Sequence, residues 1–184
     1  MHLVPDPVQR KSMLGGMFAW NTDFCLLYTD IAGSGLLPVE AETQGKIVVT
    51  TELGGGKAIP AGVHRIAQEG LRNVLTHFGV LQGEEQPREI LGEPPAVLLQ
   101  ALNEKNYLLA PESGVFEVPV DLGARVYPGQ PVGQIHFLER PDRSPEVILS
   151  QTDGFLLAFR APCLTQQGDC VTVIAEPVDP EALA

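Results

Sequence analysis

The sequence predicts an α/β fold in its first half and an all-β domain in its second half. Helix-like and strand-like segments alternate over residues 1–83, which is typical of a mostly parallel sheet covered by helices. Residues 96–176 are short apolar runs separated by glycine-rich turns, without a helical period. We therefore expect two domains joined by a polar, proline-bearing linker at residues 84–95, and a short tail at residues 177–184.

The first domain opens with two predicted helices and two predicted strands. Residues 7–20 predict a helix that Gly15 and Gly16 weaken. Residues 24–30, FCLLYTD, are a short apolar run that predicts a buried strand. Residues 38–45 predict a short helix that begins with a proline and ends with a glycine. Residues 46–53, KIVVTTEL, are the clearest strand of this half.

The best helix of the chain is predicted over residues 60–79, where Pro60 starts it and Gly79 stops it. Apolar side chains recur along it at helical spacing and form one face: Val63, Ile66, Ala67, Val74, Leu75 and Phe78. In sheets covered by helices, ligands collect at the carboxyl ends of the strands. Glu52, in the stretch TTELGGG, stands at such an end.

Composition excludes several classes of function. A formal net charge of −11 disfavours binding to the phosphate backbone of nucleic acids. No apolar stretch approaches the length of a membrane span or a signal-peptide core, so we expect a cytoplasmic protein without a membrane partner. Three cysteines without a C-x-x-C pair indicate buried free thiols, neither a disulfide framework nor a metal site.

The second domain contains an internal repeat. Residues 111–135 align with residues 151–174, each predicting a strand pair closed by a glycine turn. The matched positions are Gly114 with Gly154, Gly129 with Gly168, Val132 with Val171 and Ile135 with Ile174. The pattern predicts a barrel-sandwich-like domain with pseudo-twofold symmetry, similar to biotinyl and lipoyl carriers. The lysine that such carriers modify is missing, because no lysine follows Lys105.

Three motifs together resemble the succinylglutamate desuccinylase/aspartoacylase family. They are TTELGGG (50–56), GLRNVLTHFGVLQG (70–83) and APESGVFEVPVDLGARVYPGQPVGQIH (110–136), and the resemblance runs over residues 12–176. Within the family the sequence is most similar to the bacterial N-acetyl-diaminobutyrate deacetylases of ectoine degradation. The resemblance implies a zinc-dependent amidohydrolase, with a zinc-carboxypeptidase-like α/β domain followed by a β-rich domain.

The resemblance also implies a role for Glu52. Together with Gly54 it matches the E-x-G motif that carries the family's catalytic glutamate. In the family, this carboxylate takes a proton from a zinc-bound water that attacks an amide carbonyl, and hands it to the leaving amine. From the residues alone, an acid that caps or hydrogen-bonds the glycine turn at Gly54, Gly55 and Gly56 is the favoured interpretation.

The zinc ligands of the family have no counterpart in this chain. The family uses an early H-x-x-E motif and a later histidine, whereas this sequence has only His2, His64, His77 and His136. His64 and His77 lie thirteen residues apart on one predicted helix, too far to share a metal. A catalytic zinc takes three protein ligands, so we expect no metal to be bound by this chain alone.

The sequence thus predicts the C-terminal part of a deacylase that carries the base but not the metal. It would be a truncated chain, a degraded gene or one subunit of a split enzyme, and its partners would be a small N-acyl amino acid and either an upstream-half polypeptide or a second copy. The alternative is a non-catalytic binding or oligomerisation module. Gly54 and His136 are candidate substrate-binding residues. For His136, a solvated position at a strand end is the other interpretation.

Overall fold

The computed structural model describes residues 1–29, 35–54 and 59–183. Contacts between Cα atoms divide the chain into two compact units. The first unit contains Met1–Leu99 and Val178–Ala184, and the second contains Gln100–Pro177. Within the described ranges, no helix has both the length and the apolar character needed to cross a membrane.

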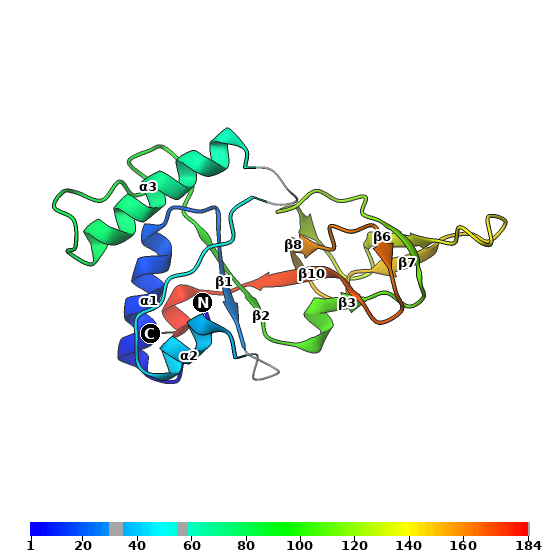
Figure 1. The fold of residues 1–184 in the computed structure, drawn as a ribbon, viewed down its shortest axis with the longest axis horizontal. Helices are drawn as coiled ribbons and strands as arrows, with labels where there is room; N and C mark the ends of the chain where they lie inside the picture. Colours follow the sequence, from blue (N-terminus) through cyan, green and yellow to red (C-terminus); the bar gives the residue numbers. More distant parts are fainter. Residues whose placement is uncertain (30–34, 55–58, 184) are drawn as a thin grey trace. The chain divides into compact units, whose positions relative to one another are not determined.

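The first unit contains three α-helices and two neighbouring strands (Figure 1). These are α1 (Pro7–Ala19), β1 (Phe24–Tyr28), α2 (Leu37–Thr43), α3 (Ala61–His77) and β2 (Val97–Ala101), with a terminal 3₁₀ turn at Pro180–Leu183. The predicted helices and the first predicted strand are confirmed, with ends within two residues of the expected ones. The start of α1 follows from its sequence, because the Asp6 side chain accepts a hydrogen bond from the backbone nitrogen of Val8 at 3.0 Å.

The core of the first unit is built mainly from α1 and the two strands. Met13, Leu14 and Met17 of α1 are buried together with Leu27 of β1 and Leu98 of β2. Burial of these apolar side chains is the main stabilising contribution in this unit.

The three cysteines are free, as predicted, but only one of them is buried. Cys25 lies in the core of the first unit, and desolvation raises the pKa of its thiol to about 11. Cys163 and Cys170 are exposed, so the prediction of burial is wrong for these two. Both belong to the second unit.

Helices α1 and α3 pack against each other at glycines. A Cβ atom on Gly15 would lie 2.8 Å from Nε2 of His77, and one on Gly16 would lie 2.8 Å from the ring of Phe78. Gly70 of α3 makes the same kind of approach to Trp20, where a Cβ would lie 2.5 Å from Nε1. The glycines that weaken the helix pattern in the sequence are therefore positions where two elements come close together.

The predicted strand at residues 46–53 is absent from the structure. Residues 46–54 are described, and they are neither helix nor strand. A strand needs a neighbour that accepts and donates its backbone hydrogen bonds, and within the described ranges residues 47–54 form none. The sequence has the composition of a strand, but the described residues do not supply a neighbour.

The second unit consists of short antiparallel strands in two sheets (Figure 1). In one sheet β10 pairs with β3 and β8, and β8 pairs with β5; the other has the order β7-β6-β4-β9. The strands are β3 (Tyr107–Leu109), β4 (Gly114–Glu117), β5 (Arg125–Val126), β6 (Pro131–His136), β7 (Glu146–Leu149), β8 (Gly154–Phe159), β9 (Leu164–Thr165) and β10 (Cys170–Pro177), with a 3₁₀ turn at Glu104–Asn106.

In the second unit, strands from the first half of the predicted repeat pair with strands from its second half. In register, Gly114 of β4 faces Thr165 of β9, while Gly154 of β8 faces Val126 of β5. The core of the unit is apolar and nearly inaccessible to solvent; it contains Phe116, Val126, Val132, Ile135, Leu156, Val171 and Ile174. In β6 and β10 the buried core residues are three positions apart, because register shifts interrupt the strict alternation of a regular strand.

Candidate functional site

Glu52 lies on the irregular segment of the first unit, with its side chain exposed. Two residues later, Gly54 has φ of 83°, a conformation that side-chain-bearing residues rarely adopt. The backbone conformation therefore explains why the third position of the E-x-G motif is a glycine. Gly55 and Gly56, which complete the predicted glycine turn, lie outside the described residues.

The segment before Glu52 is held at its start and near its middle. The backbone nitrogen of Lys46 donates to the carbonyl of Ala41 at 3.0 Å, and the Lys46 carbonyl accepts from Nε2 of Gln9 at 2.9 Å. Val49 lies over Gly16 of α1, where an added Cβ would lie 2.7 Å from its Cγ2. Glu52 comes after these anchors and is exposed to solvent.

His136 is the last residue of β6, in the second unit. Its Nε2 lies 2.5 Å from Oε2 of Glu117 on the neighbouring strand β4, and Nε2 of Gln134 donates to the same oxygen at 2.6 Å. The hydrogen bonds from Gln134 and His136 hold the pKa of Glu117 below its usual range. Glu52 and Gly54 share one segment of the first unit, whereas His136 belongs to the second unit.

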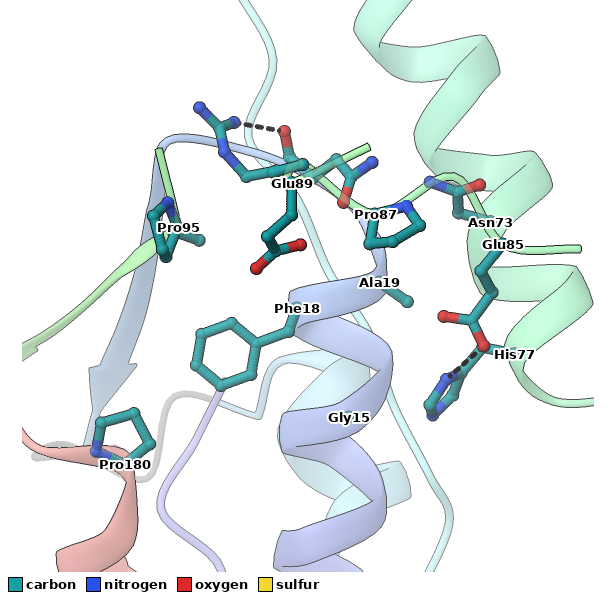
Figure 2. Close-up of a pocket in the computed structure, with 13 residues that line it drawn as sticks. Gly15, Phe18, Ala19, Asn73, His77, Glu85, Pro87, Glu89, Pro95 and Pro180 are labelled. Atoms are coloured by element: carbon teal, nitrogen blue, oxygen red, sulfur yellow. Dashed lines mark hydrogen bonds and ion pairs between the residues drawn. The ribbon is translucent and has the colours of Figure 1, made fainter. Parts of the chain in front are cut away.

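A pocket of about 450 Å³ lies in the first unit, and none of the predicted site residues lines it. Figure 2 shows Phe18 of α1 on one side and Asn73 and His77 of α3 on another, with Glu89 pointing into the space. Nδ1 of His77 lies 3.1 Å from Oε1 of Glu85 (Figure 2). The charged side chains at the pocket have protein partners, with the exception of Glu89, for which the described residues record no ion pair.

Two buried polar residues of this region were not found from the sequence. Asn73, on the apolar face of α3, donates to the carbonyl of Gln86 and accepts from its backbone nitrogen, both at 3.1 Å. Arg88 is 7% exposed and makes hydrogen bonds to Asn21, Asp23 and Pro94. An asparagine within an otherwise apolar helix face was a usable signal, whereas Arg88 in a polar stretch gave none.

The described residues do not fit a catalytic zinc. No three of their His, Cys, Asp and Glu side chains are grouped so that they could hold a metal ion. His2, His77 and His136 each face a single carboxylate, at 3.6, 3.1 and 2.5 Å respectively. A zinc site needs three protein ligands, so no chemical step is assigned to a metal held by these residues. That the chain binds no metal stays a prediction.

The chain is similar in sequence to an enzyme of known activity. It is 30% identical over 178 residues to the N-alpha-acetyl-L-2,4-diaminobutyric acid deacetylase of Halomonas elongata. The match covers 97% of this chain and 51% of the deacetylase. No family model matches the sequence.

Solved structures share the fold. The product-bound ectoine utilization protein EutE (DoeB) of Ruegeria pomeroyi matches with a TM-score of 0.85 and 31% identity, over 95% of this chain and 52% of that one. A succinylglutamate desuccinylase of Silicibacter has a TM-score of 0.83 and 34% identity, covering 96% and 52%. The succinylglutamate desuccinylase/aspartoacylase of Rhodobacter sphaeroides has a TM-score of 0.88 and 28% identity, covering 97% and 53%. The chain thus spans about half the length of the relatives it matches.

Proposed function

The chain belongs to the succinylglutamate desuccinylase/aspartoacylase family, where it corresponds to the C-terminal part, and we propose that it carries the proton-transfer residue of an N-acyl amino-acid deacylase. The substrate class is a small N-acyl amino acid, with N-acetyl-diaminobutyrate as the first compound to assay because the Halomonas relative is named for it. The observation that carries the proposal is the exposed carboxylate of Glu52, two residues before a glycine with φ of 83°.

Amide hydrolysis requires a proton to move twice. A base takes a proton from the attacking water, and an acid gives a proton to the nitrogen of the leaving amine. In this proposal Glu52 does both, because a carboxylate that accepts the first proton is then the acid for the second transfer. Gly54 lacks a side chain beside this carboxylate, which leaves room for the substrate backbone to approach.

The family resemblance implies a zinc ion, but the proposal does not assign its ligands to the described residues of this chain. Since the described residues do not form a three-ligand site, the proposal places the metal ligands in the part of the relatives that this chain does not cover. The chain alone is then expected to be inactive, and activity would require that other part.

A chimera tests the proposal directly. In the Halomonas deacetylase, the half that this chain matches would be replaced by the present 184 residues, and acetate release from N-acetyl-diaminobutyrate would be measured. Glu52→Gln in the chimera should lower kcat by about 10²–10⁴-fold, the usual contribution of a general acid–base residue. Glu84→Gln, an exposed glutamate on another irregular segment, is the matched control and should leave kcat unchanged.

Two outcomes would count against the assignment. A folded chimera without hydrolysis would favour a non-catalytic assembly module, and a Glu52→Gln chimera with undiminished kcat would exclude Glu52 as the base. We also propose His136 as a substrate-binding residue, supported by its partly exposed imidazole at the end of β6. His136→Gln should then raise KM in the same chimera with little effect on kcat.

For the second unit, we propose a barrel-sandwich-like fold with pseudo-twofold symmetry. The proposal is supported by the reciprocal pairing of β4 with β9 and of β8 with β5. It is also supported by two glycines in matched environments: an added Cβ would clash with the His136 carbonyl at Gly114 and with the Ala175 carbonyl at Gly154.

A further inference from the structure

The pocket of the first unit has an apolar wall that is attached to the core of that unit. Phe18 of α1 and Ala96 line the pocket and also pack against the buried core cluster. Three prolines continue the wall: Pro87, Pro95 and Pro180. At about 450 Å³ the pocket lies within the size range of sites that bind small molecules.

Glu89 brings an unpaired charge to this apolar wall. Among the described residues its carboxylate has neither an ion-pair partner nor a hydrogen-bond partner. Figure 2 shows this carboxylate pointing into the same space as the ring of Phe18. An anionic group and an aromatic ring beside one space are the two features that attract an organic cation.

The other charges around the pocket do not neutralise Glu89. Arg88 is the one guanidinium among the described residues that line it, and it is already paired with Asp23 at 2.7 Å and with Glu93 at 3.2 Å. Glu85, a further lining residue, adds another carboxylate. Carboxylates therefore outnumber permanent cations here, and a cleft with walls of one charge sign concentrates ions of the opposite sign.

Buried side chains fix the stretch that carries Glu89. Residues 85–89 contain neither helix nor strand. Asn73, 3% exposed, exchanges two hydrogen bonds with the backbone of Gln86, and Arg88, 7% exposed, donates to the carbonyls of Asn21 and Pro94. These bonds hold the stretch on both sides of Pro87. The wall is thus ordered before a ligand arrives, which lowers the entropy lost on binding.

We propose that this pocket binds a small organic cation, an ammonium group on a short aliphatic chain. The ammonium group lies between the Glu89 carboxylate and the Phe18 ring, and the aliphatic chain contacts the prolines and Ala96. An anion of the same shape is repelled, and a neutral analogue lacks the charged hydrogen bond. Glu52 and His136 do not line the pocket, so this inference does not rest on the proposed function.

The experiment titrates the 184-residue chain with three probes of equal chain length. These are n-butylammonium, n-butyrate and 1-butanol, each added in phosphate buffer free of other amines. Nitrogen–proton NMR spectra follow the backbone amides of Ala19 and Glu89 and the side-chain amide of Asn73. Butylammonium should shift these signals to saturation. Butyrate and butanol should bind at least about tenfold more weakly, since a charged hydrogen bond contributes roughly that factor.

Two variants separate the charge from the ring. Glu89→Gln should weaken butylammonium binding about tenfold and leave butanol binding unchanged. It should fold like the original chain, because the carboxylate has no partner among the described residues. Phe18→Leu keeps an apolar side chain without the ring and should weaken butylammonium binding about two- to fivefold. Glu84→Gln, an exposed glutamate that does not line the pocket, is the matched control and should bind normally.

Three results would overturn the inference. Equal binding of all three probes would leave only an apolar surface, and normal butylammonium binding by Glu89→Gln would exclude a cation site. Shifts that spread over the whole chain without saturation would reflect its net charge of −11 instead of a pocket. Acetate release by the chimera is measured separately, so failure of the cation site and failure of the proposed function are distinguishable.

Discussion

Nη2 of Arg88 donates a hydrogen bond to Oδ1 of Asp23 at 2.7 Å, across 65 positions of sequence. The same side chain reaches the carbonyls of Pro94 at 2.6 Å and Asn21 at 2.8 Å, and its guanidinium lies 3.2 Å from the Glu93 carboxylate. Arg88 is buried, whereas Asp23 is exposed. An irregular stretch of chain is thereby attached to the turn that precedes β1.

Replacing Arg88 should destabilise the first unit markedly. Arg88→Ala leaves two carbonyl groups without their donor and removes a charged hydrogen bond, so we expect a loss of about 2–4 kcal/mol in the free energy of unfolding. Urea titration followed by the fluorescence of Trp20, the one tryptophan of the chain, measures this loss. Arg65→Ala is the control, because its pair with Glu69 is exposed and should contribute less than about 0.5 kcal/mol. Equal effects of the two variants would contradict the anchoring role of Arg88.

Substitution by alanine should have opposite effects on stability at two glycines of α3. Gly70→Ala would place a Cβ 2.5 Å from Nε1 of Trp20 and 2.7 Å from its carbonyl oxygen, so we expect a loss of about 1–3 kcal/mol. Gly62 has open space around it, so Gly62→Ala should gain up to about 1 kcal/mol through helix propensity. The same urea titration measures both variants. Stabilisation by Gly70→Ala would mean that the two elements do not approach each other as closely as described.

The helices could be predicted from the sequence because their signals are local. Pro7 and Asp6 at the start of α1, and the apolar spacing of α3, depend only on neighbouring residues. The burial within α3 could not be predicted in the same way. Its buried members are Gly70 and Asn73, while Phe78 at its end is 40% exposed. Which residue becomes buried depends on what packs against the helix, and that information is not local.

The predicted strand at residues 46–53 shows the same limit for a sheet. Strand composition describes a preference, but a strand exists only when another strand pairs with it. The candidate site shares this limit, since the E-x-G motif identifies Glu52 and Gly54 but not the groups that would surround them. Arg88 and Asn73, which the sequence did not reveal, hold together the part of the first unit around the pocket.

Asn106 should be a strong determinant of stability in the second unit. It is fully buried; its Nδ2 donates to the Ile174 carbonyl and its Oδ1 accepts from the Asn103 nitrogen, both at 2.9 Å. Asn106→Ala leaves both partners unsatisfied, and we expect a loss of about 2–4 kcal/mol in chemical denaturation followed by circular dichroism. Glu104→Ala in the same 3₁₀ turn is exposed and should have little effect. A neutral Asn106→Ala would show that water replaces these hydrogen bonds.

The carboxylate of Glu112 should make the second unit sensitive to acid. Hydrogen bonds from Arg143, at 2.6 and 2.8 Å, and from Arg140, at 3.0 Å, lower the pKa of Glu112 from 4.5 to about 2. Because the folded state holds this proton less tightly than the unfolded state, the contribution of Glu112 is complete above pH 4.5. It is lost as the pH falls from about 4.5 towards 2. The thermal midpoint, measured by circular dichroism across this range, should fall with decreasing pH.

A difference between variants isolates the part that belongs to Glu112. Glu112→Gln cannot ionise, so its thermal midpoint should lie below that of the original chain at neutral pH, and the two should converge as the pH approaches 2. Glu139→Gln is the control from the neighbouring loop, where the described residues record no ion pair for Glu139, and it should follow the original chain throughout. Added salt should narrow the gap caused by Glu112→Gln, because this cluster is open to solvent. A gap that stays constant from neutral pH down to pH 2 would show that Glu112 acts through packing and not through its charge.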